Sequence, residues 1–249
     1  MSKLSVIIIC KNEERVIEET LSCIQGWADE IIVLDSGSSD STVEIAKKYT
    51  SQVFETDWPG YGIQKNRALG KASCDWVLTL DADERVSQEL KSEISRTIQR
   101  QPAQDGYRIP VKLLYFGKYV KSLLKNKPLI LFKRHKGKFN DLAVHESVLL
   151  DGNIGTLKKH LLHDSYESLP HQIQKLNRYA TLWAQERPAI NNGTIGLLIA
   201  CLHSFWALFK DLLLKMALAD GWRGVLLSLI HAQYTFNKYA FRIKNKLAG

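Results

Sequence analysis

Short apolar runs alternate with amphipathic segments through the first hundred residues. The runs at 4–9, 30–34, 52–55 and 76–80 carry apolar residues on both faces, which is typical of strands in a parallel sheet covered by helices. Between the first two runs, apolar side chains recur at helical spacing behind Asn12, a predicted helix N-cap. The pattern predicts an α/β fold built from successive βα units.

Polar side chains stand where three of these predicted strands end. Asn12 follows the first strand, Asp35 follows the second, and Asp81 follows the strand at 76–80. Right-handed crossovers bring the carboxyl ends of such strands to one edge of the sheet, where open α/β folds bind ligands. The sequence therefore predicts one site that contains all three side chains.

After Gly106 the pattern changes to shorter strands, such as 129–132 and 147–150, separated by basic loops. This change predicts a mixed sheet in the second half. Beyond Tyr166 the chain becomes helical, first at 171–186 and then in two longer apolar segments. We therefore expect a helical appendage in the C-terminal third.

The composition is that of a globular protein, with 45% hydrophobic and 24% charged residues among 249. A formal net charge of +8 indicates an anionic partner, which could be nucleic acid, a phosphorylated substrate or an acidic membrane surface. The four cysteines have no CxxC spacing, so neither a zinc site nor a disulfide framework is expected. A reducing compartment fits this pattern best.

The sequence predicts neither a signal peptide nor a membrane-spanning helix. The apolar run that follows Lys3 is too short for a signal-peptide core. The longest apolar candidate, 195–209, is stopped by Lys210 and Asp211, short of the roughly 18 residues that indicate a spanning helix.

Carboxylates cluster directly after the fourth predicted strand, at Asp81, Asp83 and Glu84. Like charges this close repel unless a cation neutralises them, and Mg²⁺ or Mn²⁺ shared with substrate phosphates would do so. The alternative is an acidic helix N-terminus, in which Asp83 and Glu84 interact with the dipole of a helix through Leu90. The motif alone leaves both interpretations open.

Four segments of the chain, in order, resemble the motifs of glycosyltransferase family 2. They are Val6–Glu13, Ile32–Thr42, Gln64–Ala68 and Leu80–Glu84. Within that family the chain is most similar to the β-1,4-glucosyltransferases of the lipopolysaccharide inner core, through Val144–Glu146 and Asp220–Gly224. The general match covers the first half, and the more specific match covers nearly the whole chain.

The resemblance implies the fold called GT-A, a Rossmann-like α/β sheet flanked by helices. It also implies a transfer that inverts the configuration at the anomeric carbon of the sugar. We accordingly expect residues 1–110 to bind the nucleotide sugar and residues 111–168 to form the acceptor and catalytic half of the same domain. Residues 169–249 are expected to form a C-terminal amphipathic helical region.

The resemblance also assigns the contacts of a UDP-sugar donor. The expected residues are Asn12, Glu13, Asp35, Ser36, Gln64, Arg67 and Asp81. Asp35 would accept a hydrogen bond from the uracil or ribose, as an acidic residue after a second strand can do. The segment 35–37 is also compatible with a simple turn, and Lys65 with a solvated helix face.

Metal ligation and base catalysis are expected from the same comparison. Asp81 and Asp83 would hold the cation, and His163 lies where several GT-A enzymes supply a further ligand, although a structural histidine is the alternative. An inverting transfer needs a carboxylate to take the acceptor proton. Glu146 is the first candidate and Asp141 the second. The family's usual Glu-Asp pair is replaced here by His145-Glu146, which leaves the identity of the base open, and the alternative is that Glu146 only begins the strand at 147–150.

Two further surfaces suggest partners. Basic residues mixed with aromatic ones at 118–138 are compatible with a simple solvated surface. As a binding surface they fit an anionic glycan acceptor better than nucleic acid, because no RNA-binding motif accompanies them. An apolar helical face with basic flanks fits a membrane interface, a layer packed on the domain or a contact between copies of the chain. Its members are Leu197, Leu198, Cys201, Leu202, Phe205, Leu208 and Phe209.

The sequence thus predicts a metal-dependent, inverting hexosyltransferase that is cytoplasmic and peripheral on the inner membrane. The expected substrates are a UDP-sugar, with glucose as the expected hexose, and a lipopolysaccharide inner-core acceptor. The alternatives are a family 2 transferase for a polyprenyl phosphate or a protein, and a non-catalytic module that binds nucleotide sugar or RNA. The donor sugar, linkage and oligomeric state depend on pocket details that sequence does not reveal.

Overall fold

The computed structural model describes residues 2–120, 127–140, 146–164 and 168–243. These residues divide into two compact units. Unit 1 comprises residues 1–112 and 126–163, and unit 2 comprises residues 113–125 and 164–249. The boundary falls within one strand, β7 (Val111–Tyr115).

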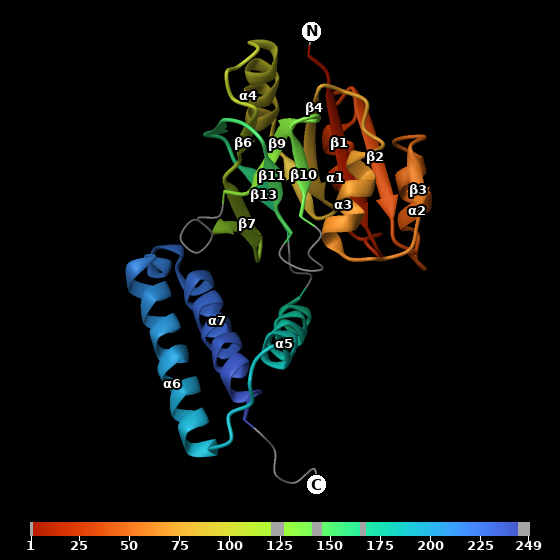
Figure 1. Cartoon of the computed structure of the whole chain (residues 1–249). Helices are drawn as coiled ribbons and strands as arrows, with labels where there is room; N and C mark the ends of the chain where they lie inside the picture. The colour runs from red at the N-terminus through yellow and green to blue at the C-terminus, as the bar shows by residue number, and fades with distance from the viewer. Residues whose placement is uncertain (1, 121–126, 141–145, 165–167, 244–249) are drawn as a thin grey trace. The chain divides into compact units, whose positions relative to one another are not determined.

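A mixed sheet of seven described strands organises unit 1 (Figure 1). From edge to edge, the strands are β12 (Ile154–Thr156), β6 (Gly106–Arg108), β9 (Leu129–Lys133), β4 (Trp76–Asp81), β1 (Leu4–Cys10), β2 (Glu30–Asp35) and β3 (Val53–Glu55). The four strands from β4 to β3 run parallel, whereas β9 is antiparallel to both β4 and β6. The predicted parallel half and mixed half are confirmed.

Helices cover both faces of this sheet, which is why every residue of β1 is buried. The helices are α1 (Ile17–Ile24), α2 (Thr42–Lys47), α3 (Tyr61–Leu69) and α4 (Gln88–Gln99). Alternate β1 residues point to opposite faces. Ile8 packs in the cluster that contains Leu21 of α1 and Ile94 of α4, and Ile7 in the cluster that contains Ala68 of α3.

One expectation and one alternative about helix starts are wrong. Asn12 is not the N-cap of α1, because Asn12 has a left-handed φ of +55° and the helix begins only at Ile17. Asp83 and Glu84 do not begin α4 either, because Glu84 opens a short strand and the α4 N-cap is Ser87, whose side chain accepts the Leu90 N–H.

Two short antiparallel pairs complete the strands of unit 1. They are β5 (Glu84–Val86) with β13 (Leu161–His163), and β10 (Gly137–Phe139) with β11 (Val148–Leu150). β7 pairs with β8 (Lys118–Val120), also antiparallel. The β5–β13 pair matters most for the site, since it places the segment after Asp83 beside His163.

Unit 2 is mainly helical, as expected for the C-terminal third. Its helices are α5 (Leu169–Gln185), α6 (Gly193–Phe209) and α7 (Trp222–Ala240), with a π-helical turn at Lys210–Leu214 and a 3-10 turn at Ala217–Asp220. α7 packs against both α5 and α6. Leu227 of α7 also packs with the β7–β8 hairpin, and Arg223 donates to the Phe116 carbonyl (2.8 Å).

The helical run in α6 is longer than the sequence predicts. The expectation that it stops at Lys210 is wrong, because the π-helical turn carries it on to Leu214. Among the described residues, this one segment, Gly193–Leu214, is long and apolar enough to cross a membrane by length and composition alone.

Candidate active site

The carboxyl ends of β1, β2 and β4 lie at one edge of the seven-stranded sheet. β1 is parallel to both neighbours, and the register sets Cys10 beside Asp35 and Ile9 beside Asp81. Asn12 follows β1 at the same edge. The pairing therefore brings together the three strand ends on which the sequence prediction depends.

Asp35 is 1% exposed and organises the loop after β2. Its carboxylate accepts hydrogen bonds from the backbone N–H groups of Gly37 (2.9 Å) and Ser38 (2.8 Å). Gly37 has a φ of +79°, in the left-handed region that favours glycine. The described contacts are those of a turn, and a nucleoside contact of Asp35 stays a prediction.

Asn12 joins its own loop to the loop after β2. Its backbone N–H donates to Ser38 Oγ (2.8 Å), and its side-chain oxygen accepts from the Ser39 N–H (2.8 Å). The backbone N–H of Glu13 donates to Thr42 Oγ1 (2.8 Å). These hydrogen bonds make the two loops one continuous rim at the strand ends.

Helix α3 supplies two more of the predicted donor residues. Gln64 is fully buried, and its Nε2 donates to Ser36 Oγ (2.9 Å) and Thr56 Oγ1 (2.7 Å). Arg67 lies partly exposed and pairs with the Asp57 carboxylate (2.7 Å). Gln64 thus braces the rim from inside, while Arg67 keeps its charge near solvent.

Lys65, also on α3, bridges two of the predicted site carboxylates. Its Nζ lies 3.0 Å from Asp81 Oδ1 and 2.7 Å from Glu146 Oε1. Burial would lower the pKa of Lys65, but the charges of Asp81 and Glu146 outweigh it and hold that pKa above its usual value. The solvated-face interpretation of Lys65 is wrong, because the residue is only 8% exposed.

The Asp83 side chain pairs with His163, whose Nε2 lies 3.1 Å from Asp83 Oδ2. The antiparallel β5–β13 register, in which His163 faces Glu84, creates this contact. Burial would lower the pKa of His163, but the hydrogen bond and charge of Asp83 raise it. Burial raises the pKa of Glu84, and the Asp81 carboxylate adds to the effect. The edge therefore concentrates carboxylates around one imidazole.

The chemistry of these groups suits a hard cation. Asp81 and Asp83 offer carboxylate oxygens, and the Asp81 side chain is half exposed. Within the described ranges, no three His, Cys, Asp or Glu side chains are grouped so as to hold a metal by themselves. A cation here would need ligands from elsewhere, and ligation by His163 would first require loss of its proton.

Of the two candidate bases, only Glu146 can be placed. Its side chain is 17% exposed and meets Lys65 just before β11. Asp141 lies outside the described residues, as does His145. Lys65 thus links the carboxylate after β4 to the carboxylate predicted to be the base.

The family of the chain is shown by a sequence comparison, in which the model for glycosyl transferase family 2 matches residues 5–160. The chain belongs to glycosyltransferase family 2. An uncharacterized glycosyltransferase of Rickettsia prowazekii is 30% identical over 96% of this chain and 86% of the relative. The lipopolysaccharide core biosynthesis glycosyltransferase LpsC of Rhizobium meliloti is 31% identical over 74% of this chain and 71% of its own.

A solved structure supports the same fold. S. aureus TarS 1–349 in complex with UDP-GlcNAc has a TM-score of 0.52 and 18% identity, covering 96% of this chain and 89% of that one. At 18% identity, the likeness shows the fold alone. The expected family 2 α/β architecture is thus confirmed, and the chain is a glycosyltransferase.

The roles of Lys65 and Glu84 in the structure differ from those that the sequence predicts. Lys65 was open to a bland interpretation because a lysine on a short helix is usually solvated. Its signal was position, since it lies between Gln64 and Arg67 in a family motif. Glu84 was grouped with the ligand carboxylates, but it is buried and accepts the Asp81 N–H (3.0 Å), so it supports the loop that presents Asp81.

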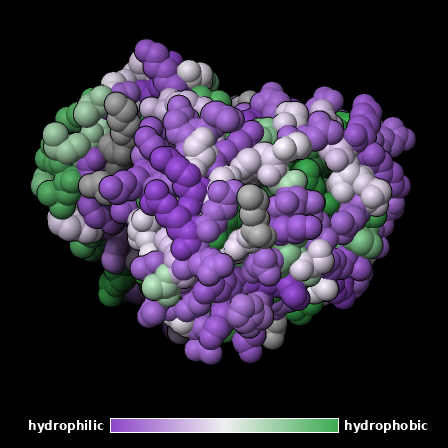
Figure 2. All heavy atoms as spheres, turned by 90° about the horizontal axis from the view of Figure 1, so that it is seen from above, coloured by the Kyte–Doolittle hydropathy of each residue, from purple (hydrophilic) through white to green (hydrophobic). Residues whose placement is uncertain are grey.

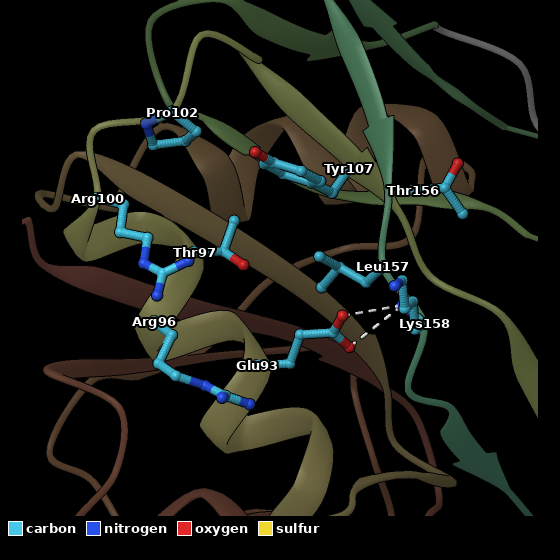
Figure 3. A pocket seen from close by; sticks show the side chains of 9 residues that line it. All are labelled: Glu93, Arg96, Thr97, Arg100, Pro102, Tyr107, Thr156, Leu157 and Lys158. Atoms are coloured by element: carbon cyan, nitrogen blue, oxygen red, sulfur yellow. Dashed lines mark hydrogen bonds between the residues drawn. The ribbon is translucent and has the colours of Figure 1, made fainter.

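One hollow of about 430 Å³ lies away from these residues (Figure 3). Arg96 of α4 and Arg100, which follows the helix, line it together with Tyr107 and Lys158. Its carboxylate, Glu93, accepts the backbone N–H groups of Lys158 (3.0 Å) and Lys159 (2.8 Å). Glu93 thereby anchors the chain after β12 to α4, and the hollow contains none of the predicted site residues.

Proposed function

We propose that this transferase moves a hexose, glucose in the first instance, from a UDP-sugar to a lipopolysaccharide inner-core acceptor with inversion. The observation that carries the proposal is the bridge of Lys65 between Asp81 and Glu146. It joins a carboxylate at the predicted donor position to one at the predicted base position. The name of LpsC supports the acceptor class, and the UDP-GlcNAc complex of TarS supports a UDP-sugar donor.

In the proposed reaction, Glu146 takes the proton of the acceptor hydroxyl while that oxygen attacks the anomeric carbon. The bond to the nucleoside diphosphate breaks as the new glycosidic bond forms, so the configuration at the anomeric carbon is inverted. Lys65 fixes the Glu146 carboxylate through its 2.7 Å contact and leaves the second oxygen for the acceptor. Such positioning lowers the activation free energy substantially when the reacting atoms are aligned.

The donor nucleotide is assigned to the rim formed by the loops after β1 and β2. Asn12 and Glu13 contribute one loop, and Asp35 and Ser36 the other. Gln64 supports the rim, and Arg67 offers a cation for the base or diphosphate. The rim is already ordered by these hydrogen bonds, which lowers the entropic cost of donor binding.

Metal dependence is part of the proposal, with Asp81 and Asp83 as protein ligands and His163 as a further ligand after deprotonation. A divalent cation bound there would stabilise the charge that develops on the leaving diphosphate. Two carboxylates combined with substrate phosphates are a common way to hold Mg²⁺ or Mn²⁺. Asp81 also contacts Lys65, so the same carboxylate links the donor side of the site to the base.

We place the enzyme in the cytoplasm, peripheral on the inner membrane, because the proposed acceptor is a lipid-anchored glycan. The net charge of +8 suits an anionic acceptor and an anionic membrane. Nucleic acid is not proposed as a partner, and self-association is left to measurement. The donor and acceptor halves, 1–110 and 111–168, remain predicted divisions of the site.

The test is UDP release from a panel of UDP-sugars, with Mg²⁺, Mn²⁺ or a chelator, with and without rough-core lipopolysaccharide. We expect release that requires a divalent cation and rises with the acceptor. Release with a polyprenyl phosphate or a protein acceptor instead would redirect the proposal to those substrates. Absence of cation-dependent turnover with every donor would contradict it.

A further inference from the structure

Helix α6 buries its small residues and exposes its large ones. The buried positions in the helix are Gly196, Ala200 and Ala207. Leu202 and Phe205 are 69% and 70% exposed. Other exposed apolar residues extend the same surface, namely Ile195, Leu197, Leu198, Trp206, Phe209, Leu213 and Leu214. We call these nine residues the α6 outer face.

This distribution is the reverse of a helix that packs in water, where large apolar side chains turn toward the core. The face of the molecule in Figure 2 is, by contrast, largely hydrophilic. Isolated exposed apolar residues need no explanation, but a contiguous apolar surface marks an interaction site.

The contacts between α6 and α7 resemble those between helices in lipid. Small residues let helix backbones approach closely, and polar side chains join the helices by hydrogen bonds. Ala200 is a small, buried position of α6, whereas Gly196 lies against Ile190 and Ile243, which are outside α7. Ser204 Oγ donates to the Ala232 carbonyl (2.8 Å), and the His203 ring stacks on Tyr239 at 4.1 Å between centroids. Polar and aromatic side chains thus contribute to the attachment of α6 to α7.

The end of the α6–α7 hairpin holds a buried charge cluster. Asp211 is 1% exposed, lies 2.8 Å from Lys215 Nζ and also pairs with His231 of α7. Lys215 and His231 thus balance the buried charge of Asp211 where the hairpin turns. Met216 and Trp222 are exposed beside it, so the turn continues the apolar surface.

Charge identifies the occupant of the surface. Between residues 193 and 243 the acidic residues are Asp211 and Asp220, and Asp211 is neutralised inside the hairpin. Of the basic residues in the same range, Lys215 pairs with Asp211, which leaves Lys210, Arg223, Lys238 and Arg242. Cations that flank an apolar helix complement anionic lipid headgroups.

We propose that the α6 outer face docks the protein on an acidic phospholipid bilayer, with α6 lying along the membrane surface. The inference rests on the membrane location in the proposed function, and it names the surface that provides it. The segment of 22 residues is long enough to cross. The charges at its turn favour the in-plane orientation, because a crossing hairpin would carry Lys215, Asp220 and Arg223 through hydrocarbon.

Cys201 provides a native probe, because it is exposed in the middle of α6, whereas Cys10 and Cys74 are buried. In the full chain with Cys23→Ser, a charged thiol reagent should modify Cys201 rapidly. Vesicles of phosphatidylethanolamine and phosphatidylglycerol should slow the reaction at least about tenfold, as expected for a helix face buried in the interface. Neutral phosphatidylcholine vesicles should protect it less.

Matched double variants separate docking from a general loss of apolar surface. Leu202→Ser with Phe205→Ser should abolish protection of Cys201 and co-sedimentation with the acidic vesicles. Leu149→Ser with Ile154→Ser removes exposed apolar side chains from unit 1, where they are 49% and 44% exposed, and should leave both unchanged. Neither pair removes a buried contact, so both variants are expected to fold.

Specific outcomes would overturn the proposal. If Cys201 is unreactive in the free protein, another part of the chain or a second copy covers the face. Equal reactivity with and without vesicles rejects docking, and a wild-type dimer that the Leu202 and Phe205 substitutions make monomeric, without vesicle protection, assigns the face to self-association. Modification of an Ala219→Cys variant by reagent sealed inside the vesicles would reject the in-plane orientation.

Vesicle binding is measured without donor or acceptor, so it is independent of transfer. Intact Cys201 protection with no UDP release would contradict the proposed reaction and leave the docking surface standing. Normal UDP release from a water-soluble acceptor analogue, with no protection of Cys201, would contradict the docking surface alone.

Discussion

Strand β1 and helix α6 are the most apolar segments of their units, and they place their large side chains in opposite ways. All seven residues of β1 are buried between helices of unit 1. In α6 the residues Gly196, Ala200 and Ala207 are buried, while Leu202 and Phe205 are exposed. Apolar content is therefore similar, but only in unit 1 does it build an internal core.

The difference separates two uses of apolar surface. In unit 1, burial stabilises the sheet and so fixes the strand ends that present Asp35 and Asp81. In α6, the exposed surface adds nothing to the folded chain in water, and its value depends on a partner. Substitutions at matched leucines should therefore affect different properties in the two units.

The largest stability effect should come from a leucine in β4. Leu78→Ala, at a fully buried position, should lower the free energy of unfolding by about 2–5 kcal/mol, because the cavity cannot fully collapse. Leu202→Ala on α6 should change it by less than about 0.5 kcal/mol. Urea denaturation followed by circular dichroism checks both, and equal losses would break the comparison.

Removal of the Lys65 charge should reduce activity strongly. Lys65→Met leaves Asp81 and Glu146 close together without their shared cation, so UDP release should fall about 100-fold, as misplacement of a reacting group can cause. Lys65→Arg keeps the charge and should recover part of the rate. If both variants lose activity equally while both remain folded, charge alone does not explain the role of Lys65.

A smaller effect is expected at the start of α7. A Cβ added to Gly224 would lie 1.9 Å from the Ala217 carbonyl oxygen, so the backbone would have to move. Gly224→Ala should destabilise unit 2 by about 1–3 kcal/mol. Gly26→Ala is the control for an alanine without a clash, although its positive φ still adds strain. Hydrogen exchange in α7 should increase only in the first variant.

The smallest effect is a pH dependence at the start of β2. Burial raises the pKa of Glu30, but hydrogen bonds from Ser5, Gln52 and Ser73 outweigh it and lower that pKa below its usual value. Its stabilising contribution is present above the unfolded-state pKa and is lost as the pH falls through the folded one. Glu30→Gln should flatten the acid side of a urea-midpoint profile, and an unchanged profile would contradict this account.

Much of the fold could be predicted because its determinants are local. The apolar runs at 4–9, 30–34 and 76–80 became β1, β2 and β4 within a residue of their predicted ends. The start of α1 was missed because Asn12 uses its side chain on Ser39 across the sheet edge instead of on its own helix. Such a contact depends on packing that the local pattern does not contain.

The site was predictable as a set of strand ends and less so as a set of contacts. The motif placed Asp81 correctly after its strand, but the partnership of Lys65 with Glu146 joins residues 81 positions apart. Likewise, the pairing of Asp83 with His163 follows from the β5–β13 register. Neither separation nor register can be read from a motif, so the electrostatics of the site required the structure.

The most direct test of the central claim compares donor binding and transfer in Glu146→Gln. The substitution keeps the size of the side chain but removes the proposed base, so UDP-sugar binding measured by calorimetry should stay close to wild type. Transfer to the rough-core acceptor should fall by at least about 100-fold. Transfer at the wild-type rate would show that Glu146 is not the base and would contradict the mechanism built on its bridge to Lys65.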